Sequence, residues 1–291
     1  MTSSSLEFAL GSLPVHRVGY GAMQLPGPGV MGPPRDHDEA IAVLRRAVEL
    51  GVDHVDTSQF YGPDVANELI REALHPYPDG LVLVSKVGAR RDEAGAWLPA
   101  QRPEELRSGV EDNLRTLGVD QLGAVNLRRM DEGHDVPEGQ DVAFEDQLAE
   151  MVALRDEGKI AGVGISNVTL EQVRTAVEAT DIACVQNPFS LVDQHDLDVL
   201  DLCAGLGIAY VPFFPLGSAF PGMPKVSDHP RVRAVAERHG ATPAQVGLAW
   251  LLALRENVLL IPGTSRVAHL EQNLAVRDVV LSEQDLAELG G

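Results

Sequence analysis

Short apolar runs rich in β-branched residues alternate along this chain with longer segments in which apolar residues recur every three or four positions. The short runs predict strands, and the longer segments predict amphipathic helices. The predicted strands are Arg17–Met23, His54–Ser58, Leu81–Val87, Leu122–Leu127, Ala161–Ser166, Ala183–Gln186, Ala209–Phe213 and Val258–Ile261. The predicted helices include residues 38–51, 66–74, 104–118, 144–158, 169–180, 197–207 and 269–276.

This alternation predicts an α/β fold, specifically a (β/α)8 TIM barrel. The strands are apolar almost throughout, as expected of a parallel sheet that helices cover. A doubly wound open sheet shares that pattern, but no linker or change in composition divides the chain. We therefore expect one closed barrel domain over residues 1–291. Two β-like pieces around Gly11, within Leu6–Val18, predict an N-terminal β-hairpin that closes the barrel floor.

Composition narrows the possible partners. Hydrophobic residues make up 44% of the chain and charged residues 23%, and the net charge is −20. Such a surface repels phosphate backbones and acidic lipid, so we expect no nucleic-acid partner and no membrane partner. The first residues lack the pattern of a signal peptide, which indicates a cytoplasmic protein, and we expect a monomer or weak oligomer. Cys184 and Cys203 are expected to be buried free thiols, and no histidine pair has the spacing of a metal site.

Polar residues at the predicted strand ends are candidates for catalysis, because such barrels carry their chemistry there. Asp56 lies at a strand end, Tyr61 follows in the next loop, and Lys86 lies inside an apolar strand. A lysine in that setting needs an anion, which Asp56 can supply. An ammonium beside Tyr61 would lower the pKa of its phenol, which could then donate a proton near neutral pH. Alternatively, Lys86 ends its strand in solvent and Tyr61 packs under a loop.

The segment IPGTSR at residues 261–266 has the features of a phosphate site before a predicted helix. Gly263 permits a tight turn, Ser265 offers a hydroxyl, and Arg266 offers a fork of donors beside a helix N-terminus. A chain with a charge of −20 needs such a local cationic site to bind a phosphorylated ligand.

A second glycine motif, GxGxxG at Gly27, Gly29 and Gly32, matches the dinucleotide-binding fingerprint in its letters. That fingerprint must end a strand and open a helix. Prolines at positions 26, 28, 33 and 34 prevent a helix from starting on the last glycine. We therefore predict a loop over the barrel mouth.

Several segments occur in an order that resembles the aldo-keto reductases and together cover nearly the whole chain. They are DTSQFYGPDVANE at residues 56–68, Lys86 on its strand, GISN at 164–167, VQN at 185–187, PLG at 215–217 and IPGTSR at 261–266. The stretches VNLRRMD at 125–131 and YVPFFPLG at 210–217 further resemble the bacterial pyridoxal reductase-like branch of that family.

The resemblance implies that Tyr61 protonates a carbonyl oxygen, that Lys86 lowers the pKa of Tyr61, and that Asp56 holds Lys86. Many members of the family carry a histidine at the end of the fourth strand, where this chain has Arg128. Arginine stays protonated, so we expect Arg128 to polarise and orient the carbonyl rather than relay a proton. The alternative is that Arg128 only pairs with Asp131.

The resemblance also implies NADPH, oxidised to NADP+, as the cofactor. The chain has, in the family's order, residues that match the cofactor contacts of its members. In the family such residues bind the nicotinamide carboxamide, stack on the nicotinamide ring, approach the pyrophosphate or hold the 2′-phosphate. The implied cofactor-binding residues are Gly21, Met23, Ser166, Asn167, Gln186, Phe213, Leu216, Gly217, Gly263, Ser265, Arg266 and Asn273.

The reaction that follows is NADPH-dependent reduction of an aldehyde, with pyridoxal, giving pyridoxine, as the favoured small-molecule substrate. The expected substrate-binding residues are Phe60, Trp97 and Arg129, and Phe220 is a further candidate. Three alternatives remain. One is a cofactor-binding regulatory barrel with little catalysis, another is a reductase of other aldehydes or ketones, and the third is a phosphate-handling isomerase barrel.

Overall fold

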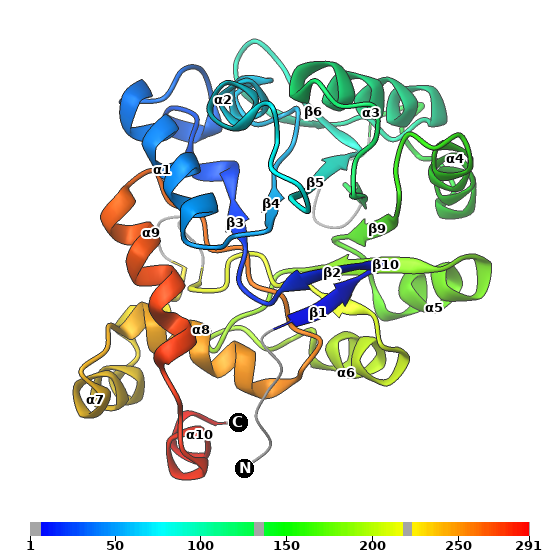
Figure 1. The fold of residues 1–291 in the computed structure, drawn as a ribbon. Coiled ribbons are helices and arrows are strands. Elements are labelled where there is room, and N and C mark those ends of the chain that lie inside the picture. Colours follow the sequence, from blue (N-terminus) through cyan, green and yellow to red (C-terminus); the bar gives the residue numbers. More distant parts are fainter. Residues whose placement is uncertain (1–6, 131–136, 218–222, 291) are drawn as a thin grey trace.

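The computed structural model describes residues 7–130, 137–217 and 223–290. Its centre is a parallel sheet in the order β11-β10-β9-β8-β5-β4-β3, curled into a barrel (Figure 1). The strands are β3 (Tyr20–Gly21), β4 (His54–Asp56), β5 (Val82–Val87), β8 (Ala124–Arg128), β9 (Val163–Ser166), β10 (Ile182–Gln186) and β11 (Ala209–Tyr210).

Residues 257–260 form the eighth strand-like segment of the barrel. This segment pairs with β11 on one side and with residues 17–19, which precede β3, on the other. On one side, the amide of Tyr210 donates to the carbonyl of Asn257 at 2.9 Å. On the other side, the amides of Gly19 and Leu260 donate at 2.8 Å to the carbonyls of Leu260 and Arg17. Because both edges are paired, the predicted closed barrel is confirmed and an open sheet is excluded.

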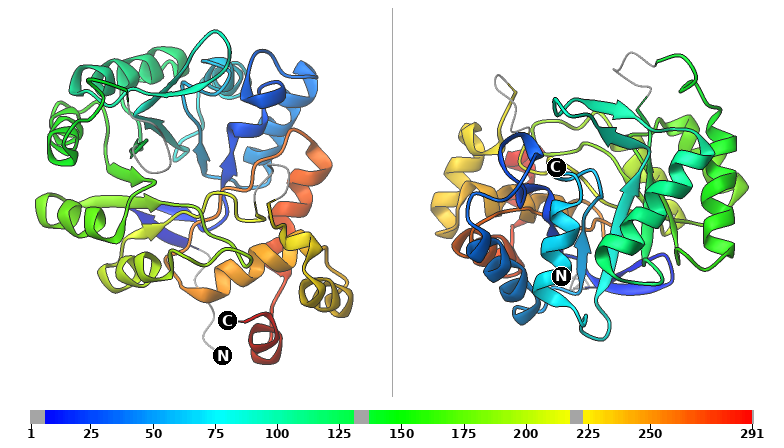
Figure 2. Two further views of the ribbon diagram at one scale, coloured as in Figure 1. Left: turned by 180° about the vertical axis from the view of Figure 1, so that it is seen from behind. Right: turned by 90° about the horizontal axis from the view of Figure 1, so that it is seen from above.

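The helices surround the strands, as the views in Figures 1 and 2 show. Their bounds are α1 (His37–Glu49), α2 (Val65–Leu74), α3 (Pro103–Leu117), α4 (Phe144–Asp156), α5 (Leu170–Ala179), α6 (Leu197–Leu206), α7 (Pro230–His239), α8 (Pro243–Leu254), α9 (Val267–Leu274) and α10 (Glu283–Leu289). Local signals fix several ends. Thr169 and Gln172 form a capping box at the start of α5, and Gly118 ends α3 in the left-handed conformation.

Two hairpins cover the two ends of the barrel. β1 (Glu7–Leu10) and β2 (Leu13–His16) pair antiparallel, and the amide of Gly11 donates to the carbonyl of Ala183 near the start of β10. This confirms the predicted hairpin at the barrel floor. At the opposite end, β6 (Ala89–Arg91) and β7 (Trp97–Pro99) form a hairpin between β5 and α3 that the sequence pattern did not reveal.

Both cysteines are buried and free, as predicted. Burial raises the pKa of Cys184 and of Cys203 to about 12, so both thiols stay protonated. Within residues 7–130, 137–217 and 223–290, no helix has the length and apolar character needed to cross a membrane. The same residues contain no group of three acidic, histidine or cysteine side chains placed to hold a metal ion.

The close contact between Gly19 and His54 gives a test of the packing inside the barrel. A Cβ at position 19 would overlap the imidazole of His54, a side chain that is 1% exposed and cannot move aside. Gly19→Ala should therefore lower the free energy of unfolding by about 1–3 kcal/mol, as overpacking does. Urea denaturation followed by circular dichroism measures the change.

Gly205→Ala is the matched control, because no atom lies within 4 Å of a Cβ at position 205 in α6. That substitution should leave stability unchanged or raise it by up to about 1 kcal/mol. Equal unfolding free energies for wild type and Gly19→Ala would contradict the packing described here.

Candidate active site

The carboxyl ends of neighbouring strands bring most of the predicted catalytic side chains together. Because the strands are parallel, their last residues lie at one end of the barrel. The register pairs Ser166 with Arg128 on one side and with Gln186 on the other. Asp56 is the last residue of β4, and Lys86 precedes the last residue of β5.

Lys86 and Asp56 form a buried ion pair, and each side chain is 5% exposed. The Lys86 ammonium donates to Oδ1 of Asp56 and, at 3.1 Å, to the carbonyl of Thr57. Nε2 of Gln186 donates to Oδ2 of Asp56 at 2.9 Å, so both carboxylate oxygens are occupied. Burial is the largest influence on the pKa of Lys86 and lowers it, but Asp56 and Tyr61 raise it and the net direction is upward.

Tyr61 lies in the loop after β4 and is 5% exposed, with the Lys86 Nζ atom 5.2 Å from the centroid of its ring. Burial is the largest influence on the phenol and raises its pKa. The charges of Lys86 and Arg128 oppose that effect without reversing it. The pKa of Tyr61 therefore lies above its usual value: Lys86 acts in the predicted, lowering direction, but burial outweighs it and makes the net shift upward. The phenol keeps its proton at neutral pH, as a proton donor must.

A buried polar network, which the sequence analysis missed, supports the ion pair from behind. Oγ1 of Thr57 donates to Oδ1 of Asn67 at 2.8 Å, and Nδ2 of Asn67 donates to Oδ1 of Asn113 at 2.9 Å. Oγ of Ser85 donates to the same oxygen of Asn113 at 2.6 Å. The network joins β4, α2, α3 and β5 and fixes the backbone of Thr57. Its one sign in the sequence is that Asn67 and Asn113 lie on the apolar stripes of their helices.

Arg128 ends β8 and is mostly buried, close enough to Tyr61 for their charges to interact. Its Nη1 atom lies 3.4 Å from Oγ of Ser166, and its guanidinium carbon lies 5.1 Å from the ring centroid of Phe213. Burial, the larger influence, lowers the pKa of Arg128. Among the residues that the structure describes, no carboxylate pairs with this guanidinium. Asp131, its alternative predicted partner, lies outside the described residues.

Aromatic side chains extend from Tyr61 toward the hairpin at the barrel mouth. Phe60 packs edge to face against Tyr61 at 5.4 Å and against Trp97 at 5.6 Å between ring centroids. Arg91 of β6 stacks on Trp97 at 4.1 Å and donates to the carbonyl of Gly29 at 2.9 Å. The glycine motif is therefore part of a loop fastened beside the site, as predicted, and opens no helix at its last glycine.

Arg129 does not join this group. Its Nη1 atom donates to Oε1 of Gln147 in α4, and its guanidinium lies over the ring of Phe144 at 5.6 Å. Successive side chains along a strand point to opposite faces, so an Arg128 directed at the site sends Arg129 toward α4. The structure thus gives Arg129 a packing partner and does not place it at the substrate pocket. Phe220 lies outside the described residues.

Gln186 also differs from its expected place, because it is 1% exposed and holds Asp56 instead of facing the barrel mouth. Its Oε1 atom and Nε2 of His54 are buried without a partner among the described residues. Both residues, with Asp56, line an interior cavity of about 10 Å³, which has room for one water molecule.

The end of the eighth strand meets β3 backbone to backbone. A Cβ at Gly21 would lie 2.5 Å from the carbonyl oxygen of Ile261, and a Cβ at Gly263 would lie 2.6 Å from that of Gly21. Only glycine permits both contacts. Gly21 and Gly263 therefore serve first to let the two strand ends close together.

The predicted phosphate site lies at the start of α9, where Ser265 and Arg266 are exposed. Oγ1 of Thr264, a residue that sequence reasoning missed, accepts from the amide of Arg266 at 3.1 Å. Oε1 of Glu39, from α1, accepts from the amide of Val267 at 3.0 Å. Across the described parts of the chain, no acidic side chain forms an ion pair with Arg266.

The remaining predicted cofactor residues follow β3, β9 and β11 in the chain or lie on α9. Asn167 follows β9 with a φ of 56°, and its Nδ2 atom donates to the carbonyl of Arg129 at 2.9 Å. This leaves Oδ1 of Asn167 as an acceptor. The residues Met23, Phe213, Leu216, Gly217 and Asn273 are half-buried.

The residues present fit a nicotinamide nucleotide by the chemistry of their donors. The hydroxyl of Ser265 and the guanidinium of Arg266, both exposed before α9, form a donor set suited to a phosphate. Phe213 offers an aromatic face near the strand tips, and Asn167 offers an amide oxygen.

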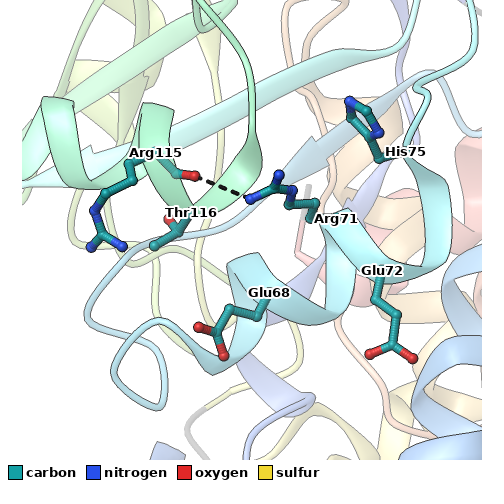
Figure 3. Close-up of a pocket in the computed structure, with 6 residues that line it drawn as sticks. All are labelled: Glu68, Arg71, Glu72, His75, Arg115 and Thr116. Atoms are coloured by element: carbon teal, nitrogen blue, oxygen red, sulfur yellow. Dashed lines mark hydrogen bonds between the residues drawn. The ribbon is translucent and has the colours of Figure 1, made fainter.

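A depression of about 460 Å³ lies elsewhere, on the outside of the barrel between α2 and α3. Figure 3 shows Arg71 reaching toward the carbonyl of Arg115, with Nη1 and the oxygen 3.5 Å apart. Its other lining groups are polar and of both signs, and Arg115 and Glu72 have partners in Asp112 and His37. The depression contains none of the residues at the strand tips.

Comparison with known proteins places this arrangement in a class. The profile of the Aldo/keto reductase family matches residues 17–290, and the chain belongs to that family. It is 52% identical to a pyridoxine 4-dehydrogenase of Escherichia coli, over 99% of this chain and 98% of the relative. It is also 36% identical to an uncharacterised oxidoreductase of Schizosaccharomyces pombe, over 96% of this chain and 87% of the relative.

Solved structures agree with this assignment. A thermostable aldo-keto reductase in complex with the inhibitor epalrestat superposes with a TM-score of 0.81 at 26% identity, covering 98% of both chains. An aldo/keto reductase from Klebsiella pneumoniae in complex with NADP and acetate gives a TM-score of 0.79 at 26% identity, covering 98% of this chain and 94% of the other. The chain is thus an oxidoreductase of the barrel type that the sequence predicted.

A double-mutant cycle on Lys86 and Asp56 tests the buried pair. Lys86→Met leaves the carboxylate of Asp56 buried without a counter-ion, so it should lower the free energy of unfolding by about 3–5 kcal/mol. Adding Asp56→Asn removes the stranded charge and should restore part of that stability. Urea unfolding of the four proteins gives the coupling energy, and a value near zero would show that the pair does not interact.

Proposed function

We propose that this protein is an NADPH-dependent aldehyde reductase whose favoured substrate is pyridoxal, which it reduces to pyridoxine. The observation that carries this proposal is the buried phenol of Tyr61 at a strand tip beside the Lys86–Asp56 pair. A reductase of other aldehydes or ketones would use the same groups.

The relatives support the choice of substrate and cofactor. A chain 52% identical to this one is named pyridoxine 4-dehydrogenase, and oxidation of pyridoxine at its 4-position is the reverse of the proposed reaction. A structural neighbour with 26% identity is in complex with NADP. The donor set of Ser265 and Arg266 at the start of α9 suits the additional phosphate that distinguishes NADPH from NADH.

The residues at the strand tips divide the work of carbonyl reduction. When bound, the reduced nicotinamide supplies a hydride to the carbonyl carbon. Tyr61 gives its proton to the carbonyl oxygen, so that the aldehyde becomes a primary alcohol, and the phenol later regains a proton from solvent. Lys86 and Arg128 stabilise the negative charge that passes from the carbonyl oxygen to Tyr61. Asp56 and Gln186 position Lys86 and take no proton.

The setting we propose is the cytoplasm, with a small-molecule partner only. The buried free thiols Cys184 and Cys203 suit a reducing compartment. Among the described residues, the large hydrophobic side chains that are exposed are Leu197, Leu206, Met223 and Val280. Leu197 and Leu206 are the first and last residues of α6, and Met223 and Val280 lie in other segments, so no cluster of neighbouring residues supplies all four, which favours a monomer or weak oligomer.

The alternatives lack support from the site. A regulatory barrel has no use for a buried ion pair aimed at a protonated phenol, because such a pair costs free energy to bury. An isomerase that held a substrate phosphate at Arg266 would have no role for Tyr61.

Replacing the proposed acid gives the first test. Tyr61→Phe should fold, bind NADPH within about twofold of wild type, and lose about 10²–10⁴-fold in turnover of pyridoxal, the usual contribution of a general acid. A continuous assay that follows the loss of NADPH absorbance measures turnover. Tyr77→Phe is the control, because the Tyr77 phenol donates to the carbonyl of Leu117 on α3, away from the strand tips. Near-normal turnover by Tyr61→Phe would contradict the assignment.

The pH dependence follows from the same phenol. Because burial raises its pKa above the usual value, Tyr61 is protonated throughout the neutral range and loses its proton only at higher pH. The kcat for reduction should therefore stay constant through neutral pH and fall only at a pH above the range in which an ordinary tyrosine ionises. A fall in kcat between pH 7 and pH 9, traced to Tyr61, would show that the lysine outweighs burial.

Removing Arg266, which we propose binds the 2′-phosphate, tests the preference for NADPH over NADH. Arg266→Ala should weaken NADPH binding by about 10- to 100-fold and NADH binding by less than about threefold, because only NADPH carries the 2′-phosphate. Titration of protein fluorescence measures both affinities. Arg174→Ala on α5 removes the same charge from an exposed position and should leave both unchanged. Equal weakening of NADPH and NADH by Arg266→Ala would contradict the assignment.

A further inference from the structure

Arg128 is a half-buried cation at the site with no anionic partner among the described residues. Lys86 is paired with Asp56, and the guanidinium of Arg129 is held by α4. Arg128 has only a weak contact with Ser166 at 3.4 Å and the face of Phe213 at 5.1 Å among the described residues. Burying a guanidinium without a counter-ion is costly, so this position is one where a ligand can supply the missing negative charge.

The surroundings of Arg128 indicate what kind of ligand carries that charge. The register pairs Lys86 with Asn126, two residues before Arg128, so Lys86 and Arg128 lie on the same face of neighbouring strands. The Nζ atom of Lys86 lies 5.2 Å from the ring centroid of Tyr61, so an anion bound by Arg128 lies on the Tyr61 side of the site. The aromatic side chains Phe60, Trp97 and Phe213 border the same region. Aromatic walls favour a flat ring as the body of the substrate.

We infer that Arg128 binds an oxygen anion on the ring carbon next to the aldehyde, so that the enzyme selects aromatic aldehydes with an acidic hydroxyl ortho to the reacting group. This inference rests on the proposed reductase activity and names the substrate class of that same site. Arginine suits the role because its charge is permanent and its donors form a planar fork.

The chemistry of such aldehydes explains why pairing would help the reaction. An ionised ortho hydroxyl releases electrons into the carbonyl and repels the negative charge that develops on the carbonyl oxygen during hydride transfer. A guanidinium on that hydroxyl oxygen counters both effects. In pyridoxal the ring nitrogen makes the neighbouring hydroxyl acidic, because a positive charge in the ring favours the anion.

Three pyridine aldehydes provide a matched test of the hydroxyl. They are 3-hydroxypyridine-4-carboxaldehyde, its 3-methoxy analogue and pyridine-4-carboxaldehyde, each assayed with NADPH as kcat/KM. The quantity compared is kcat/KM for the hydroxy aldehyde divided by kcat/KM for the methoxy aldehyde. The intrinsic reactivities of the two aldehydes cancel when this ratio is compared between wild type and variant. Arg128→Met should lower the ratio by about 10- to 100-fold, the effect of losing a hydrogen bond to a charged group.

Two further variants separate charge and geometry from general damage. Arg128→Lys keeps the charge without the fork and should retain part of the ratio. Arg90→Met removes an exposed arginine of β6 and should leave the ratio unchanged. Thermal unfolding of the ligand-free proteins separates a binding role from a structural one. Loss of an arginine that stabilised the fold would lower the melting temperature. Because Arg128 is a half-buried cation without a counter-ion among the described residues, Arg128→Met should melt at the wild-type temperature or above it.

Several outcomes would overturn the inference. One is an unchanged ratio in Arg128→Met, and another is a lower melting temperature accompanied by an equal loss on all three aldehydes. Phenylglyoxylate carries a carboxylate next to its carbonyl group. A higher kcat/KM for phenylglyoxylate than for 3-hydroxypyridine-4-carboxaldehyde would overturn the ortho-hydroxyl assignment. These results leave the reductase function intact. NADPH oxidation with none of the aldehydes would instead overturn the proposed function itself.

Discussion

The buried ion pair of Lys86 and Asp56 constrains the rest of this structure, because two charges removed from water must have every donor and acceptor satisfied. Lys86 of β5 reaches Asp56 of β4 and the carbonyl of Thr57, and Gln186 of β10 completes the carboxylate from across the barrel. A slip of any of these strands by one residue would turn a side chain to the opposite face and strand a charge. The pair therefore fixes the register of the strands as well as the surroundings of Tyr61.

The two cations at the strand tips, Lys86 and Arg128, differ in whether the described part of the protein supplies a counter-ion. The charge of Lys86 is neutralised internally, so it holds the phenol of Tyr61 without needing a ligand. Arg128 lies on the same side with no internal anion among the described residues, which makes it the group that a substrate can satisfy. Arg129, one residue further, faces α4 and stabilises the barrel wall. Strand alternation thus separates a binding role from a packing role in two adjacent arginines.

The two ends of the barrel do different things. At the floor, the β1–β2 hairpin packs against the first residues of the strands and buries them. At the mouth, the β6–β7 hairpin brings Trp97 toward Phe60, and Arg91 ties the glycine-rich loop to it. Connections at the mouth are free to vary without disturbing strand pairing, which is why the substrate walls and Tyr61 come from loops while Asp56, Lys86 and Arg128 come from strands.

Much of this architecture follows from the sequence, because hydrophobic periodicity is local and each strand and helix carries its own pattern. The barrel, the floor hairpin, the capping box at Thr169, the buried thiols and the order of Asp56, Tyr61 and Lys86 are all visible in it. The direction of the Tyr61 pKa, the side on which Arg129 packs, and the use of Gln186 to hold Asp56 are not. Each of these depends on what lies across the barrel from a residue, and burial and charge at that distance arise only when strands far apart in the chain meet.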